Sequence, residues 1–299
     1  MRKVLLILVT LVAILAIIGI YLVWGPAVKN PDKKFLYIPT GATIVQVKDS
    51  MKAHSFLENF GVFDKVASWY KLPENIKPGK YKVDNGMSIF NLVKKLRTGR
   101  QETVNLVITK LRIPEDLAKR ISRNFELDSV SVMDFLTSND SLLSFNVDTN
   151  TVLTDVIPDT YSYFWTADMR TIFKKLFDEN QKFWNEERLS KAQRLGLSPT
   201  EVYILSSIVE EETNKQDDKG KVASVYINRL RKGNRLEADP TVKFALKNFA
   251  LTRILHGHLD VVSPYNTYRN TGLPPGPICT PSRKTLEAVL DAPETNYMF

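Results

Sequence analysis

The pattern of hydrophobic and polar positions changes sharply near the start of the chain. Residues 4–24 form an uninterrupted uncharged run, VLLILVTLVAILAIIGIYLVW, whereas apolar and polar residues are interspersed in the rest of the chain. The run is long enough to cross the ~30 Å hydrocarbon core of a bilayer as one helix. Arg2 and Lys3 precede it, so the positive-inside rule predicts that residues 1–3 are cytoplasmic and that everything after Trp24 lies outside. We expect an uncleaved transmembrane helix. The alternative is a cleaved signal peptide, whose apolar stretch is usually shorter and ends in an Ala-x-Ala-like site.

A short pattern then occurs twice after a polar linker at residues 25–34. Gly41-Ala-Thr-Ile-Val-Gln-Val and Gly86-Met-Ser-Ile-Phe-Asn-Leu each follow a strand-like stretch. Each copy predicts a strand, a glycine turn, an N-cap at Thr43 or Ser88, and a helix with apolar positions at 3.6-residue spacing. Such units resemble LysM-like wall-binding modules, so we expect a LysM-like subdomain over residues 35–105. A small α+β spacer is the alternative.

The pattern from residue 106 to residue 195 is mainly helical. Apolar residues recur at helical spacing in Leu117, Ile121 and Phe125, and again from Ile172 onwards. This middle region therefore has a helical character that separates it from the strand-containing repeats before it.

A well-marked helix begins the last region, residues 196–299. Ser198 is a typical N-cap and Pro199 suits the first helical position, and the helix ends in three consecutive glutamates, residues 210–212. Successive residues point about 100° apart on a helix, so the three carboxyls have different surroundings. Glu210 lies on the side of Ser206 and Ser207, where small residues leave space for a ligand. Apolar neighbours are expected to raise its pKa, as a general acid requires. Taken alone, the helix favours the alternative of a solvated acidic face.

Charge and composition indicate which partners and which kinds of site the protein is expected to have. The 41 Lys and Arg against 33 Asp and Glu give a net charge of +8, which favours an anionic partner. The predicted topology places most of the chain across the membrane, so nucleic acid is not expected. A single cysteine, Cys279, excludes an intrachain disulfide, and it does not make a zinc site with His256 and His258. We expect neither a metal nor a cofactor.

Five motifs in the last hundred residues together resemble one known family, the endolytic murein transglycosylases, or YceG-like proteins. They are Ser207-Ile-Val-Glu-Glu-Glu-Thr, Val222-Ala-Ser-Val-Tyr-Ile-Asn-Arg-Leu, Asp239-Pro-Thr-Val, Tyr265-Asn-Thr-Tyr and Gly272-Leu-Pro-Pro-Gly-Pro-Ile, in the family's order. The resemblance runs from the membrane segment to the end of the chain. It implies an α+β fold with a mixed α/β catalytic domain over residues 196–299 that carries its acid on a helix.

The resemblance also implies a function. Such a protein is a single-pass inner-membrane lyase that cuts nascent peptidoglycan between N-acetylmuramic acid and N-acetylglucosamine, leaves a 1,6-anhydro-muramyl end and terminates strand elongation. Its partners would be glycan strands, the membrane and peptidoglycan synthases. One carboxyl suffices for this reaction, because the C6 hydroxyl of the sugar is the nucleophile.

The catalytic acid implied by the resemblance is the first glutamate of the motif, Glu210, with Glu212 as the second candidate. Other family motif positions, expected to bind substrate or support the site, are Glu212, Thr213, Asn228, Arg229, Asp239, Tyr265, Asn266 and Tyr268. Two departures stand out. The family's lysine between the glutamates is Glu211 here, which we expect to face water, and the family usually continues beyond Phe299, so we expect a catalytic domain truncated at its C-terminus.

Two other functions compete with this interpretation. One is a non-catalytic peptidoglycan-binding membrane scaffold whose acidic helix end is only surface. The other is a hydrolase of the same bond, which would need a second carboxylate beside the acid.

Overall fold

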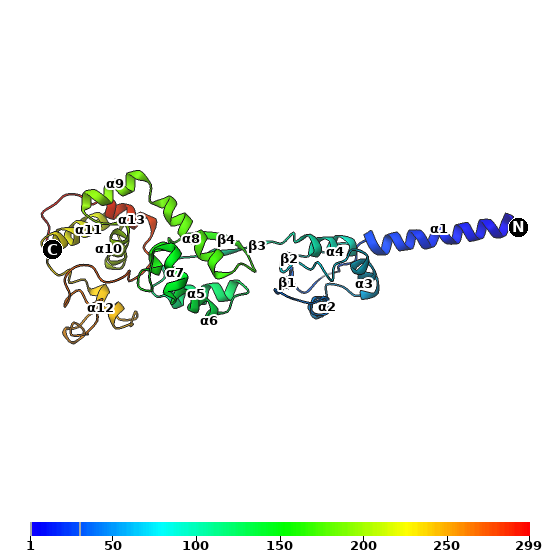
Figure 1. Ribbon diagram of the computed structural model, residues 1–299, viewed down its shortest axis with the longest axis horizontal. Coiled ribbons are helices and arrows are strands. Elements are labelled where there is room, and N and C mark those ends of the chain that lie inside the picture. The colour runs from blue at the N-terminus through cyan, green and yellow to red at the C-terminus, as the bar shows by residue number, and fades with distance from the viewer. Residues whose placement is uncertain (1, 30) are drawn as a thin grey trace. The chain divides into compact units, whose positions relative to one another are not determined.

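The fold mixes helices with small sheets and carries an apolar helix at its N-terminus, as the sequence predicts. The computed structural model describes residues 2–29 and 31–299 (Figure 1). The chain forms two compact units. The first unit contains the chain up to Val104 together with Ser162–Ala167, and the second unit contains Asn105–Tyr161 and Asp168–Phe299.

Helix α1, Arg2–Trp24, is long and apolar enough to span a membrane, and it is the one such helix in the part of the chain that the structure describes. None of its residues is buried in the protein. An apolar helix left uncovered by protein suits contact with lipid. At its end, the ring of Trp24 lies 5.6 Å from the ring of Phe90, centroid to centroid.

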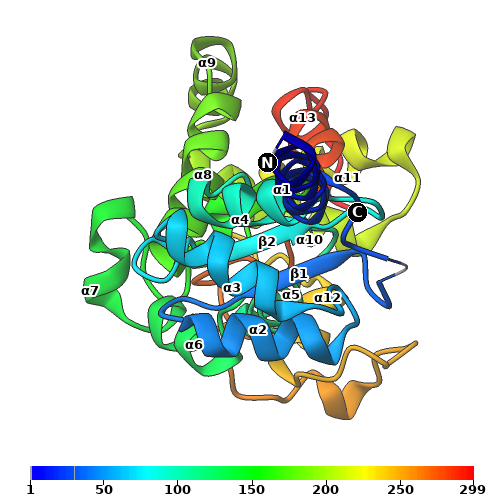
Figure 2. The same ribbon diagram turned by 90° about the vertical axis from the view of Figure 1, so that its right-hand side faces the viewer.

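The first unit is built on the repeated strand and helix pattern. Strands β1, Phe35–Ile38, and β2, Gly79–Lys82, pair antiparallel, with Phe35 opposite Lys82. Besides α1, the helices of this unit are α2, Ile44–Ala53, α3, Phe60–Trp69, and α4, Ile89–Thr98 (Figure 2).

The predicted caps of this unit are present. The Thr43 side chain accepts from the Gln46 amide at the start of α2, and Ser88 caps α4 in the same way. Gly41 and Gly86 have φ angles of 77° and 79°, so each turn uses a left-handed conformation that glycine adopts without strain. The resemblance of this unit to LysM modules stays a prediction.

Strands β3, Thr103–Val107, and β4, Thr160–Phe164, form a two-stranded sheet of their own. Between and after these strands the middle region is mainly helical, as predicted. Its helices are α5, Pro114–Asn124, α6, Ser129–Leu136, α7, Asn139–Leu142, α8, Met169–Phe183, and α9, Glu186–Leu195, with 3₁₀ turns η1, Leu143–Phe145, and η2, Val152–Asp155.

Residues 196–299, predicted as mixed α/β, contain helices and loops and no strand, so that prediction is wrong. The helices are α10, Pro199–Glu212, α11, Gln216–Arg231, α12, Asp239–Ala245, and α13, Arg283–Leu290, with a 3₁₀ turn η3, His256–His258. The segment before α13 is rich in proline and glycine and lacks the period-2 alternation of a strand, so it runs as loops. Helix α10 packs against α11, α12 and α13.

Candidate active site

Helix α10 brings the acidic motif out of the core of the second unit. Its start is fixed by a capping box, in which the Ser198 amide donates to the Glu201 carboxylate at 2.8 Å. Residues 202–209 are buried on every side. Residues 210–212 follow where the helix leaves the core, so each glutamate meets different neighbours.

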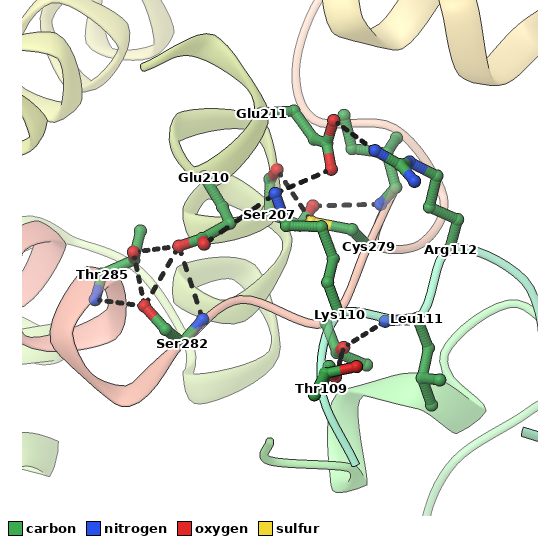
Figure 3. Close-up of polar contacts among 12 residues, drawn as sticks. Thr109, Lys110, Leu111, Arg112, Ser207, Glu210, Glu211, Cys279, Ser282 and Thr285 are labelled. Atoms are coloured by element: carbon green, nitrogen blue, oxygen red, sulfur yellow. Dashed lines mark hydrogen bonds and ion pairs between the residues drawn. The ribbon is translucent and has the colours of Figure 1, made fainter. Parts of the chain in front are cut away.

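Glu210 lies in a network of donors (Figure 3). Its Oε2 accepts from Lys219 Nζ at 2.9 Å, from Ser282 Oγ at 3.1 Å and from the Thr285 hydroxyl, and Lys110 Nζ lies 3.9 Å from Oε1. Burial acts to raise the pKa of this carboxyl, but the hydrogen bonds from Thr285 and Lys219 and the charges of Lys219 and Lys110 outweigh burial and lower it. Glu210 is therefore held as a carboxylate, and the predicted raised pKa is wrong.

The space expected beside Glu210 is filled. Ser206 and Ser207 are completely buried. The Ile278 amide donates to Ser207 Oγ at 3.0 Å, and Cys279 Sγ lies 3.4 Å from the Ser207 carbonyl oxygen (Figure 3). The small serines accommodate a distant segment of the chain rather than a ligand.

Glu211 does not face water, contrary to the prediction. Its side chain is 19% exposed and forms ion pairs of 3.1 Å with both Lys110 and Arg112 (Figure 3). These two basic residues come from the segment before α5. Lys110 approaches both Glu210 and Glu211, so the first two acids of the motif are neutralised by protein cations.

Glu212 has different surroundings. It is an exposed residue at the end of α10, and its Oε2 accepts from the Tyr226 hydroxyl at 3.2 Å. Burial of the carboxyl end of the side chain raises the pKa of Glu212, the nearby charge of Asp239 raises it further, and Tyr226 and Lys243 oppose this without cancelling it. The pKa of Glu212 is therefore raised, whereas that of Glu210 is lowered.

Asp239 and Tyr268 lie beside Glu212. The Tyr268 hydroxyl donates to Asp239 Oδ1 at 2.7 Å, and the charges of both Asp239 and Glu212 raise the pKa of Tyr268 after burial and this hydrogen bond. We call Glu212, Tyr226, Asp239 and Tyr268 the Glu212 cluster. Its members come from α10, α11, α12 and the loop after α12, so the fold assembles it from four separate segments.

Three further predicted residues make contacts within the segments that carry this cluster. Thr213 Oγ1 accepts from the Lys215 amide at 3.1 Å, directly after α10. Asn266 is buried, and its side-chain amide donates to two loop carbonyl oxygens at 2.8 Å each. The half-buried Tyr265 ring packs on Phe244, with centroids 4.6 Å apart.

The predicted pair Asn228 and Arg229 contacts other parts of the chain. Asn228 Nδ2 donates to the carbonyl oxygens of Thr295 and Tyr297 at 2.7 and 3.0 Å. Arg229 Nε donates to the Arg235 carbonyl oxygen at 2.8 Å, and its guanidinium pairs with Glu237. These two side chains hold the turn after α11 and the end of the chain.

Sequence reasoning missed Lys219 and Tyr226, which contact Glu210 and Glu212 respectively. The two residues are seven positions apart, two turns of α11, and so share one face of that helix. That spacing was available in the sequence. The sequence does not show that this face of α11 packs against the end of α10, because no local pattern determines how two helices pack.

Among the residues that the structure describes, no group of three or more His, Cys, Asp and Glu side chains is arranged to hold a metal ion.

Comparison with known proteins places these motifs in a family. The model of the YceG-like family matches residues 36–299. The chain belongs to the YceG-like family. The resemblance found in the sequence is thereby confirmed.

Similar proteins include the endolytic murein transglycosylase of Bacillus subtilis (strain 168), which is 26% identical over 305 residues, covering 95% of this chain and 84% of that protein. That of Streptococcus pneumoniae (strain R6) is 23% identical over 88% of this chain, which spans about half, 53%, of the pneumococcal protein. The crystal structure of a YceG-like protein from Listeria monocytogenes matches with a TM-score of 0.59 and 26% identity, over 90% of this chain and 93% of that one.

Proposed function

We propose that this protein is a membrane-anchored lytic transglycosylase that cuts peptidoglycan strands internally between N-acetylmuramic acid and N-acetylglucosamine and leaves 1,6-anhydro-muramyl ends. Family membership and the names of the relatives support this reaction class. The observation that carries the proposal is the Glu212 cluster, in which a partly buried carboxyl of raised pKa, on a residue that is exposed overall, lies beside a second carboxylate and two tyrosines.

The proposed acid is Glu212, which reverses the ranking suggested by the sequence. A general acid must hold its proton near the working pH, and a raised pKa favours that state. Glu210 has a lowered pKa and its Oε2 already accepts several hydrogen bonds, so it is suited to joining α10, α11 and α13. Although its carboxyl end is partly buried, Glu212 as a residue is exposed at the end of α10, which leaves room for a glycan to approach.

The reaction needs one carboxyl. Glu212 gives its proton to the glycosidic oxygen as the bond from that oxygen to C1 of muramic acid breaks. The C6 hydroxyl oxygen of the same sugar forms the new bond to C1, and its proton returns to the Glu212 carboxylate. Tyr226 orients Oε2 through its hydrogen bond, and the negative charge of Asp239 stabilises the positive charge that develops at C1.

The test is mass spectrometry of peptidoglycan digested by the full-length protein in detergent. We compare wild type with Glu212→Gln, Glu210→Gln and the matched control Glu211→Gln, each checked for folding by circular dichroism. Wild type should produce anhydro ends, and Glu212→Gln should reduce them by at least 100-fold, a loss typical of removing a general acid. Glu211→Gln should retain cleavage.

Other outcomes separate the alternatives. Full cleavage by folded Glu212→Gln together with loss in folded Glu210→Gln would return the acid role to Glu210. Reducing muramyl ends would indicate a hydrolase, for which Asp239 is the available second carboxylate. Absence of any product from folded wild type would favour the non-catalytic scaffold.

The proposal also covers the location of the protein and the roles of its parts. The α1 helix would anchor the protein in the inner membrane with a cytoplasmic N-terminus, residues 35–105 would form the LysM-like subdomain, and Thr213, Tyr265 and Asn266 would support the segments that carry the Glu212 cluster. Peptidoglycan synthases would supply the nascent strands.

A further inference from the structure

A separate pocket lies in the second unit, between η2, α8 and the start of α10. It encloses about 240 Å³ and is lined by Asp155, Asn180, Phe177, Trp184 and Tyr203, among others. A liquid water occupies about 30 Å³, so the pocket has room for a short organic chain rather than a single water. None of the Glu212 cluster belongs to its lining.

The unusual group in this pocket is Asp155. The residue is 5% exposed, and its Oδ2 is buried without a hydrogen-bond partner. Buried polar atoms in proteins are nearly always hydrogen-bonded, and an unpaired buried carboxylate is costly. All lining residues are described, and none of them is Lys, Arg or His, so the pocket supplies no counter-charge of its own.

The walls around Asp155 are aromatic and fixed. The Tyr203 hydroxyl donates to the Val156 carbonyl oxygen at 2.5 Å, and Asn180 Nδ2 donates to the Thr154 carbonyl oxygen at 2.8 Å. These bonds hold the backbone on both sides of Asp155, so the carboxyl cannot find a partner by a small shift of η2. Phe177 and Trp184 add ring surfaces that favour cations and aliphatic chains.

We propose that this pocket binds a primary ammonium group carried on a short aliphatic chain, with Asp155 as its counter-ion and the aromatic side chains around its methylene groups. A single acceptor carboxylate, aromatic walls and the lack of basic lining residues all match such a cation and disfavour an anion. The amine has two sources, a lysine-type side chain of a peptide or a free diamine. This site does not depend on the proposed glycan cleavage.

Binding should depend on pH. Burial raises the pKa of Asp155 to about 7 in the free protein. An alkylamine keeps its charge up to about pH 10, so a proton competes with it for Asp155 below about pH 7 and affinity should increase from pH 5.5 to pH 8. The lining residues from α8 are uncharged, and the one titratable group from α10 is Tyr203, whose pKa burial raises well above its usual value.

The experiment titrates full-length protein in detergent with cadaverine by isothermal calorimetry, with intrinsic tryptophan fluorescence, to which Trp184 in the pocket wall contributes, as a second readout. Asp155→Asn keeps the shape of the side chain and removes its charge. Asp178→Asn is the matched control, because it removes a carboxylate from the solvent-facing side of α8, where Asp178 pairs with Lys174. At pH 8, Asp155→Asn should weaken binding at least tenfold and Asp178→Asn less than twofold.

Further measurements on the wild-type protein use other ligands and a second pH to identify which kind of amine binds. Pentanol, which lacks the charge, should not bind, and comparison of cadaverine with an N-acetyl-lysine amide tells a free diamine from a peptide side chain. Wild-type affinity for cadaverine should fall at least fivefold from pH 8 to pH 5.5. The proposal is overturned by no binding at pH 8, by affinity that does not change with pH, or by unchanged affinity in folded Asp155→Asn.

Discussion

The three adjacent glutamates at the end of α10 are the same residue type but have different electrostatic surroundings, because each contacts different side chains. Glu210 and Glu211 meet cations, whereas Glu212 meets a tyrosine hydroxyl and a second acid. The sequence correctly places the acids on a well-capped helix. It could not rank them, because Lys110, Ser282 and Thr285 come from segments about 70 to 100 residues away. The expectation of ligand space beside Ser206 and Ser207 is wrong for the same reason, because residues 278–279, distant in sequence, fill that space.

The hydrogen bond from Tyr226 to Glu212 gives a pH prediction. In the proposed mechanism cleavage requires protonated Glu212, so activity should fall as the pH rises through its raised pKa. The bond from Tyr226 opposes that raised value, so Tyr226→Phe should move the alkaline limb of the kcat/KM profile to higher pH. Tyr265→Phe, whose ring packs on Phe244, should leave the limb in place. An unshifted limb in active, folded Tyr226→Phe would contradict the role of this bond.

The buried pair Lys219 and Glu210 gives a stability prediction. Lys219 Nζ lies 2.9 Å from Glu210 and 2.6 Å from the Thr285 hydroxyl oxygen. Lys219→Met leaves the carboxylate without its main counter-charge and should lower the free energy of unfolding by about 3 kcal/mol. The double variant Lys219→Met, Glu210→Gln should recover most of this loss in urea denaturation. If the double variant is as unstable as the single one, the pair does not act through charge.

The contribution of Glu210 to the stability of the folded protein changes with pH in one direction. The pKa of Glu210 is lower in the folded protein than in the unfolded chain. Its contribution to stability is therefore present above the unfolded value and is lost as the pH falls through the folded value.

At the scale of elements, local patterns in the sequence predict where helices begin. The sequence contains no pattern that shows which distant segments pack together. The caps at Thr43, Ser88 and Ser198 are where the sequence predicts them, because each depends on residues within one turn. The failed expectation is the mixed α/β character of residues 196–299. Proline and glycine punctuate the loops there, and no alternating stretch supports a strand.

One of those loops contains a glycine that packing requires. A Cβ atom on Gly276 would clash with the Asn150 carbonyl oxygen and lie 3.0 Å from the Tyr265 hydroxyl oxygen. Gly276→Ala should therefore lower the free energy of unfolding by about 1–3 kcal/mol, as overpacking against backbone does. Gly257→Ala is the control, since nothing lies within 4 Å of its added Cβ. Equal thermal stability of the two variants would show that the loop relaxes freely.

At the scale of the whole molecule, the sequence and the structure divide the chain differently. The sequence suggested boundaries after residues 105 and 195. The structure joins residues 106–195 to the last region in one unit, except for Ser162–Ala167, which belongs to the first. The segment begins within β4, which pairs with β3, and the sequence does not reveal which strands pair.

Membrane topology provides the last prediction, and the structure supplies its probes. The one cysteine, Cys279, is completely buried and should not react with a maleimide in the folded protein. Val262 is 86% exposed, so Val262→Cys gives a reactive thiol in the second unit. In intact spheroplasts a membrane-impermeant maleimide should label Val262→Cys, whereas Lys3→Cys should be labelled only after permeabilisation, because Arg2 and Lys3 favour a cytoplasmic N-terminus. Labelling of Val262→Cys only after permeabilisation would reverse the orientation, and release of the protein without residues 1–24 would indicate a cleaved signal peptide instead of an anchor.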